Sequence, residues 1–142
     1  MKPLFRACLA LAVLLYVAMM FWTFPAITQA ANGERAFDLR PFGYGFGQAK
    51  SFLAALNAEG RAIYLGAQHW LDTAYPAILA LTLVLGSALV AQKAAWTWLM
   101  AVLALLGAVF DYRENLLVAR MLKTAPDALT PELVASASQA TE

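Results

Sequence analysis

RAIYLGAQHWLDTAYPAILALTLVLGSALVAQ, residues 61–92, joins the most polar helical face of the chain to its clearest membrane span. Residues 74–90 carry no charge, so we expect a transmembrane helix over about residues 70–92. Just upstream, polar side chains recur at spacings of four, four and three, which places them on one helical face. These side chains are Tyr64, Gln68, Asp72 and Tyr75, with His69 beside them. A polar stripe therefore enters the outer end of an apolar helix.

Composition places the chain among membrane proteins. Of its 142 residues, 62% are hydrophobic and only 13% are charged, which leaves too few polar side chains to cover a soluble globule. The length fits a single membrane domain, residues 1–142. The formal net charge of +1 gives no concentrated basic patch, so we expect no nucleic-acid partner. With Cys8 as its single cysteine, the chain can form neither an internal disulfide nor a cysteine-based metal site.

Two further uncharged runs predict two more spans. The first run follows two positive charges and predicts a helix over about residues 5–24, with Pro25 as its stop. The alternative is a cleaved signal peptide with a small-x-small site at residues 28–30, although the run exceeds the roughly 7–15 apolar residues of a signal. The other run follows a very short turn at Lys93 and predicts a span over about residues 94–112.

The connection between the first two spans, residues 26–60, is polar and rich in glycine. We expect it to lie on the membrane surface, with a short amphipathic helix over residues 48–58 that Gly60 closes. Within this connection, the glycines at 43, 45 and 47 alternate with aromatic side chains. Either these aromatics rest in the lipid head-group layer, or they form a lid over a ligand pocket. The candidate polar residues of this loop are Asp38, Arg40 and Tyr44.

A second polar cluster follows the third span. Because the second and third spans form an antiparallel hairpin, this cluster returns to the side where Asp72 lies. Its members are Asp111, Arg113, Glu114 and Asn115. All of them except Arg113 share one helical face. The helix should continue to residue 123, and residues 124–142 should form a polar, loose tail with a helix start at Thr130.

The charges that flank the spans bear on orientation. A positive amino terminus favours a cytoplasmic N-terminus in a bacterial inner membrane, because the first helix usually dominates. A plain count opposes this orientation, since three basic residues would lie inside and seven outside. We still favour a cytoplasmic N-terminus, because the inside segments carry no acidic residue.

Four segments are distinctive as a set. They are FDLRPFGYG at 37–45, GRAIY at 60–64, LDTAYP at 71–76 and DYRENLLVARML at 111–122. Together they resemble a family of small, functionally uncharacterised bacterial integral membrane proteins, and the resemblance covers most of the chain from Phe37 onward. It implies four spans, with a final helix after a Ser/Thr-rich segment such as ASASQAT here, and it implies no activity.

The two polar clusters leave three uses open, since ionisable residues inside a membrane are costly and suggest function. In the first use they are structural, with a carboxylate paired to Arg61 or Arg113. In the second they form the polar end of a pocket for a lipid or an isoprenoid. In the third they act on a lipid substrate through an acid or His69. A metal version of this third use would draw on His69, Asp72, Asp111 and Glu114.

The chain shows no cofactor motif. One histidine at HxxD spacing is common by chance, so we predict no metal site. GYGFG lacks the strand-to-helix context and the Lys-Ser/Thr of a phosphate-binding loop. No serine has the setting of a nucleophile, and nothing favours haem.

We therefore expect an all-α integral membrane bundle of three transmembrane helices with short interfacial helices. The favoured function is noncatalytic. The protein would bind a lipid-like ligand, or it would serve as an accessory subunit beside a membrane-protein partner or a second copy. The alternative is a membrane enzyme that acts on a lipid or isoprenoid through the Asp/Glu/His cluster at the outer interface.

Overall fold

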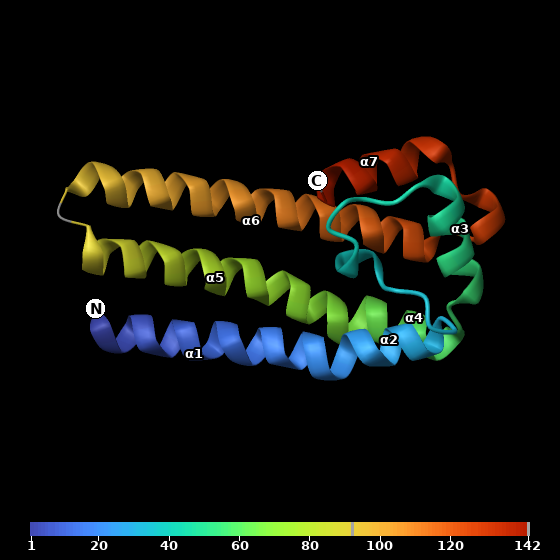
Figure 1. Cartoon of the computed structure of the whole chain (residues 1–142), viewed down its shortest axis with the longest axis horizontal. Coiled ribbons are helices and arrows are strands. Elements are labelled where there is room, and N and C mark those ends of the chain that lie inside the picture. Colours follow the sequence, from blue (N-terminus) through green and yellow to red (C-terminus); the bar gives the residue numbers. More distant parts are fainter. Residues whose placement is uncertain (92, 142) are drawn as a thin grey trace.

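The structure is a computed structural model that describes residues 1–91 and 93–141, and its regular elements in that range are all helices. Three long helices lie side by side, with shorter elements at one end (Figure 1). The first long helix comprises α1 (Lys2–Ala18), the π-helical turn η1 (Met19–Thr23) and α2 (Phe24–Ala30). The second comprises α4 (Ala58–Ile63), the π-helical turn η3 (Tyr64–Gln68) and α5 (His69–Val90). The third is α6 (Ala94–Lys123).

The shorter elements form a cap, which we define as residues 31–57 and 124–141. It contains η2 (Phe37–Leu39), α3 (Phe46–Ala55), η4 (Pro126–Ala128) and α7 (Pro131–Thr141). Each of the three long helices is long and apolar enough to cross a membrane, as the sequence predicts. They extend beyond the predicted spans at the cap end, where the turns nearest the cap contribute residues to its core. The predicted end of the second span, Gln92, lies outside the described residues.

The expectation that Pro25 stops the first helix is wrong. The helix continues to Ala30, and Pro25 occupies the first turn of α2. Just before it, the N–H of Phe24 bonds to the carbonyl of Met19, five residues back, in the wider turn η1. A π-helical turn shifts the hydrogen-bonding register of the helix. Proline has no N–H, but at the start of a helical segment that N–H would have no partner, so the proline does not interrupt the helix.

Two details of the predicted surface connection also differ. The helix predicted over residues 48–58 is α3, which ends at Ala55 because Leu56 adopts an extended conformation. Gly60 does not close it but lies inside α4, where the side chain of Asn57 accepts a hydrogen bond from the Gly60 N–H at 2.9 Å. A Cβ at position 60 would lie 2.4 Å from the Cβ of Ala30, so the glycine permits close contact between the first two long helices.

The predicted loose tail is instead ordered. Residues 131–141 form α7, which packs against α6 and α3, with Val134 and Ala137 buried. The predicted start at Thr130 is confirmed, since its hydroxyl oxygen accepts a hydrogen bond from the Leu133 N–H at 3.3 Å. Alanines alternate with serines along α7. The sequence therefore shows no pattern of large hydrophobic residues that would predict the buried face of this helix.

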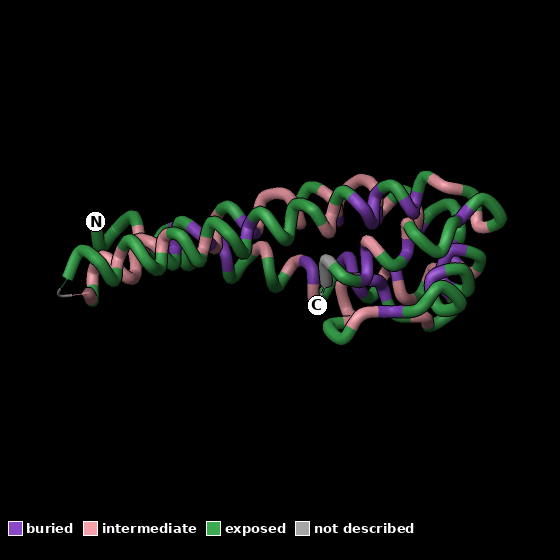
Figure 2. The backbone as a smooth tube through the Cα atoms, turned by 90° about the horizontal axis from the view of Figure 1, so that it is seen from above, coloured by how far each residue is buried: buried purple, intermediate pink, exposed green. Residues whose placement is uncertain are grey.

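Burial is concentrated in and beside the cap (Figure 2). The core contains Phe37, Phe52, Met121 and Leu122, all 0–1% exposed. Away from the cap, the long helices expose large apolar side chains over most of their surface. Such extended apolar surface fits a lipid environment.

Candidate functional site

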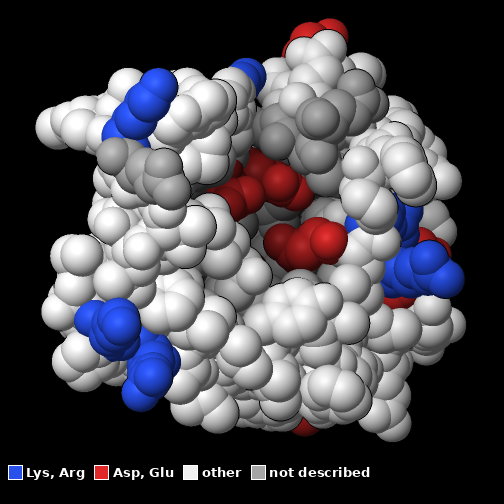
Figure 3. Space-filling model, turned by 60° about the vertical axis from the view of Figure 1, so that its left-hand side comes forward, with Lys and Arg blue, Asp and Glu red and all other residues white. Residues whose placement is uncertain are grey.

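A hollow lies where the three long helices meet the cap. Residues of the first long helix, α5 and α6 line it, and α5 packs against both of the other helices. Figure 3 shows acidic side chains gathered inside a hollow that opens toward the end of the molecule where α1 begins. Its volume is about 310 Å³. The lining residues are Tyr16, Met19, Phe24, Asp38, Pro41, Asp72, Tyr75, Pro76, Asp111, Glu114 and Asn115.

Four carboxylates from three separate elements converge on this acidic hollow. They are Asp38 of η2, Asp72 of α5, and Asp111 and Glu114 of α6. Among the described residues that line it, none is lysine or arginine. Four acceptors in a partly buried space repel one another and favour the uptake of protons or of a hydrogen-bond donor.

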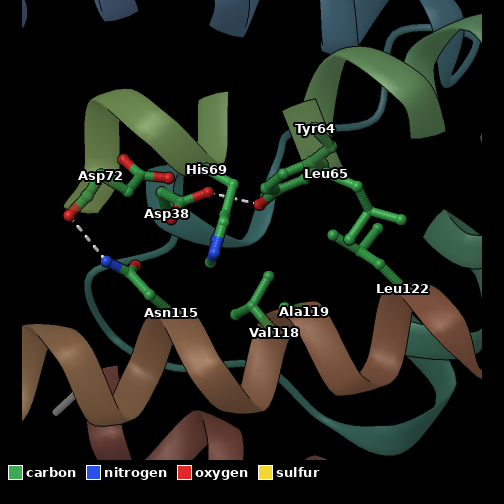
Figure 4. A pocket seen from close by; sticks show the side chains of 9 residues that line it. All are labelled: Asp38, Tyr64, Leu65, His69, Asp72, Asn115, Val118, Ala119 and Leu122. Carbon is green, nitrogen blue, oxygen red and sulfur yellow. Dashed lines mark hydrogen bonds between the residues drawn. The ribbon is translucent and has the colours of Figure 1, made fainter. Parts of the chain in front are cut away.

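Asp38 is held in place by a buried tyrosine. The Phe37 N–H donates to Tyr64 Oη at 3.1 Å, and the same hydroxyl donates to the Asp38 carboxylate (Figure 4). The Phe37 ring, which is fully buried, anchors the loop. Burial raises the pKa of the Asp38 carboxyl above its ordinary value, although the hydrogen bond from Tyr64 opposes this shift.

Asp72 is positioned by a polar chain that crosses between the first two long helices. Gln68 Nε2 donates to Asp72 Oδ1 at 2.7 Å, and the Thr23 hydroxyl donates to Gln68 Oε1. Thr23 and Gln68 are completely buried, so each needs the partner that the other provides. Thr23 is the last residue of η1 and Gln68 is the last residue of η3, and these two π-helical turns contact each other. Such turns are frequent at functional sites.

The carbonyl of Asp72 has lost its usual helical donor, because Pro76 has no N–H. Asn115 of α6 supplies the missing donor, with its Nδ2 atom 2.9 Å from that carbonyl oxygen. One residue further on, the Tyr112 hydroxyl donates to the Thr73 carbonyl at 2.9 Å. Neighbouring helices commonly satisfy the backbone groups that a proline frees in this way. Asn115 is therefore a structural member of the second polar cluster.

An apolar trough continues from the acidic hollow between α5 and α6. Its volume is about 260 Å³, and Pro76 and Asp111 line both spaces. Small residues of the two helices leave this room. The lining residues are Pro76, Leu79, Ala80, Leu83, Met100, Leu103, Ala104, Gly107, Ala108 and Asp111. The polar hollow and the apolar trough are thus neighbours that adjoin at Pro76 and Asp111.

The structure brings together all four predicted carboxylates but not the arginines. Arg61 donates to the carbonyls of Leu122 and Leu53, and it thereby ties α4 to α6 and α3. Arg113 is exposed and does not line the hollow, as the sequence predicts. Arg40 lies 3.7 Å from Glu34, away from the hollow.

Tyr44 and His69 lie beside the hollow. The Tyr44 ring packs 4.6 Å from the Phe37 ring, and burial, together with the charge of Glu114, raises the pKa of its hydroxyl. His69 points between α5 and α6 toward Val118, into a space of only about 10 Å³ (Figure 4). Such a space holds at most one water molecule. Among the described residues, no group of three His, Cys, Asp or Glu side chains lies in an arrangement that could hold a metal ion.

Sequence reasoning missed the contribution of the first long helix. Tyr16, Met19 and Phe24 line one wall of the hollow, and Thr23 supports Gln68. A signal was present, because Tyr16 and Thr23 interrupt the apolar run seven residues apart and so share a helical face.

Comparisons of the chain with protein-family models, with curated proteins and with solved structures find no match. The geometry of the site therefore carries the functional argument. Chemically, the hollow offers hydrogen-bond acceptors to a polar head group, and the trough offers an apolar surface to an apolar chain.

Proposed function

We propose that this protein is a membrane protein that binds a lipid-like molecule without transforming it. The head group would lie in the acidic hollow and the apolar chain in the trough. One observation carries the proposal, namely that Pro76 and Asp111 line both spaces. The two volumes, about 310 and 260 Å³, together lie in the range of small-molecule sites.

The charge of the hollow specifies the head group that it would accept. Ionised carboxylates only accept hydrogen bonds, so they favour a head group rich in N–H or O–H donors. Asp111 is the best placed of them, because it stands at the junction of the hollow and the trough. The Asp72 carboxylate already accepts a hydrogen bond from Gln68 Nε2, so part of its accepting capacity is used.

The surroundings of the site support a membrane setting. The three long helices would span a bacterial inner membrane with the N-terminus in the cytoplasm, and the cap would then lie on the outer face. Figure 3 shows the hollow open toward the end of the molecule where α1 begins, and the long helices that run in that direction are apolar enough to cross a membrane, so a bound chain could run along them inside the bilayer. A head group at the interface would remain close to water.

Catalysis on the bound lipid is the second candidate, and Asp38 favours it. Because burial raises the pKa of Asp38, this carboxyl keeps its proton at a higher pH than an exposed aspartate does. A buried acid with a raised pKa beside three further carboxyl groups is a candidate for proton transfer.

Native mass spectrometry of the gently solubilised protein tests the proposal. We expect one discrete lipid-like adduct on the wild type. Asp111→Asn should reduce its occupancy about tenfold or more, since a hydrogen bond to a charged group contributes about 1.5–3 kcal/mol. Asp127→Asn makes the same change in charge on the outer face of the cap, where the Asp127 side chain is 97% exposed, and should leave the adduct unchanged.

A protein without any adduct would contradict the proposal, and so would an adduct that both variants keep equally. A stoichiometric protein partner in place of the ligand would instead support an accessory subunit. A bound molecule whose mass changes with time in the wild type but not in Asp38→Asn would favour the enzyme.

A further inference from the structure

Phe42 is the most exposed large apolar side chain of the cap, with 93% of its surface accessible. It lies in a tight turn in which the Gly43 N–H donates to the Arg40 carbonyl at 3.0 Å. Gly43 has a φ of +74°, a conformation that glycine adopts readily and that turns the chain back toward the cap core. The turn therefore presents Phe42 at its tip.

The loop that carries Phe42 is fixed on both sides. Before the turn, Phe37 is fully buried and its N–H bonds to the Tyr64 hydroxyl. After it, the Tyr44 ring is buried and the Tyr44 N–H donates to Ser138 Oγ at 2.8 Å. Two aromatic residues of the loop thus enter the core, whereas Phe42 faces outward from a rigid support.

Exposed aromatic side chains surround the long helices at the level of this turn. Trp22 is adjacent to Thr23, which contacts Gln68, and Trp70 lies two residues beyond Gln68. Tyr112 bonds to the backbone of α5 at Thr73. The exposed fractions are 59% for Trp22, 75% for Trp70 and 39% for Tyr112. Tryptophan and tyrosine concentrate at membrane–water interfaces, so this level corresponds to the head-group layer.

The loop reaches back along the long helices toward that level (Figure 1). Pro41, the neighbour of Phe42, lines the acidic hollow together with Tyr16 and Asp111. At the opposite ends of the helices, Lys93, Trp96 and Trp98 mark a second interface. Along α6, Lys93 and Asp111 lie about 27 Å apart at about 1.5 Å per residue, close to the hydrocarbon thickness of a bilayer.

We infer that Phe42 inserts into the lipid head-group layer and docks the cap onto the outer leaflet. Pro41, next to Phe42, lines the hollow together with Tyr16 of the first long helix, so one partner, the lipid bilayer, would cover both the turn and the exposed apolar side chains of that helix. The inference rests on the proposed membrane setting and adds a consequence to it. With the cap docked, the acidic hollow opens into the leaflet, so a lipid-like ligand reaches it without crossing water.

Fluorescence quenching in phosphatidylcholine vesicles tests this inference on the full-length chain. In a Cys8→Ala background, Phe42→Cys is labelled with bimane, and the vesicles carry nitroxide lipids labelled at the head group or in the acyl chain. Trp22→Cys is the membrane-level control, and Asp127→Cys is the control for the outer face of the cap. Phe42 contributes little to packing because it is exposed, and equal thermal midpoints of the labelled variants check this.

We expect head-group nitroxide to quench the label at position 42 as strongly as at position 22, and several-fold more than at position 127. Equal behaviour at positions 42 and 127, with quenching by aqueous iodide, would overturn the inference. Shielding of position 42 from both quenchers would also overturn it, because it would place a protein partner there. If lipid quenching is seen at position 42 but native mass spectrometry shows no ligand, the docking stands and the ligand-binding proposal fails.

Discussion

In the cap, Phe37 and Phe52 are completely buried, whereas in α6 the most apolar 18-residue segment has only 6% of its residues buried. Both regions are rich in apolar side chains, but only the cap covers its own. The cap is built as a small soluble core would be, with aromatic rings 4.6–4.8 Å apart around Phe37. The long helices expose their apolar surface, and such a surface fits a lipid bilayer as the surrounding medium.

The difference shows why the acidic hollow lies where it does. At the boundary between the two regions, polar side chains have access both to protein partners and to the interface. Gln68, Asn115 and Tyr64 use that position to satisfy buried groups, while Asp111 faces the hollow. The following predictions test this contrast between a self-packed cap and long helices with exposed apolar surface.

The largest expected effect is in the cap core. Phe37→Ala should lower the free energy of unfolding by about 3–5 kcal/mol, because it opens a cavity among packed aromatic rings. Leu105→Ala removes an apolar side chain that is 61% exposed on α6 and should change stability little. Denaturant unfolding in detergent micelles measures both. Equal losses would show that the long helices depend on tight packing as the cap does.

A smaller effect is expected where the first two long helices touch. Gly60→Ala should destabilise the protein by about 1–3 kcal/mol, since the new Cβ would meet Ala30 and Leu56 within 2.7 Å. Gly107→Ala, which meets nothing within 4 Å, should be neutral or stabilising by up to about 1 kcal/mol. Thermal unfolding of the two variants compares them, and a stable Gly60→Ala protein would contradict the close contact.

The hydrogen bonds that α6 donates to the carbonyls of Asp72 and Thr73, next to Pro76, should each contribute to stability. Asn115→Leu leaves the Asp72 carbonyl without its donor and should cost about 1–3 kcal/mol. Tyr112→Phe removes a hydrogen bond at a more exposed position and should cost about 0.5–1.5 kcal/mol. If detergent stability falls more for Tyr112→Phe than for Asn115→Leu, the proline-freed carbonyl is not the critical group.

The smallest effect is a dependence on pH. Because burial raises the folded-state pKa of Asp38 above its ordinary value of 3.8, the folded protein holds this proton more tightly than the unfolded chain. The resulting stability is fully present below about pH 3.8 and is lost as the pH rises through the folded-state pKa. Asp38→Asn keeps an acceptor for Tyr64 and should flatten this part of the profile. A thermal midpoint that falls with rising pH equally in both proteins would exclude Asp38 as its source.

The sequence predicts the parts of the fold that depend on the composition of continuous segments. An uncharged run of about 20 residues can be recognised in isolation, so three helices and their hairpin follow from it. The end of the first helix at Pro25 and the loose tail were wrong, because tertiary contacts decide both. The π-helical turn before Pro25 is stabilised by the Thr23–Gln68 contact, and the face of α7 is buried by small residues against α6.

The candidate site could be predicted in part. Spacing on a helix identifies Asp72, Asp111 and Glu114, since a hairpin returns them to one end. Spacing cannot show that Arg61 reaches backbone carbonyls, because that depends on where α4 meets the end of α6. Nor can it identify the trough, which arises from the side chains of two helices packed together.

Photo-crosslinking from the trough tests the central claim most directly. A photoreactive amino acid would replace either Leu103, which lines the trough, or Leu105, which lies outside it on the same helix and is exposed. After irradiation in membranes, intact mass analysis should show one discrete adduct from position 103 that is lost in Asp111→Asn. Position 105 should give the mixed masses of the bulk lipids. The same mixture from both positions, unaffected by Asp111→Asn, would contradict a specific lipid-like ligand.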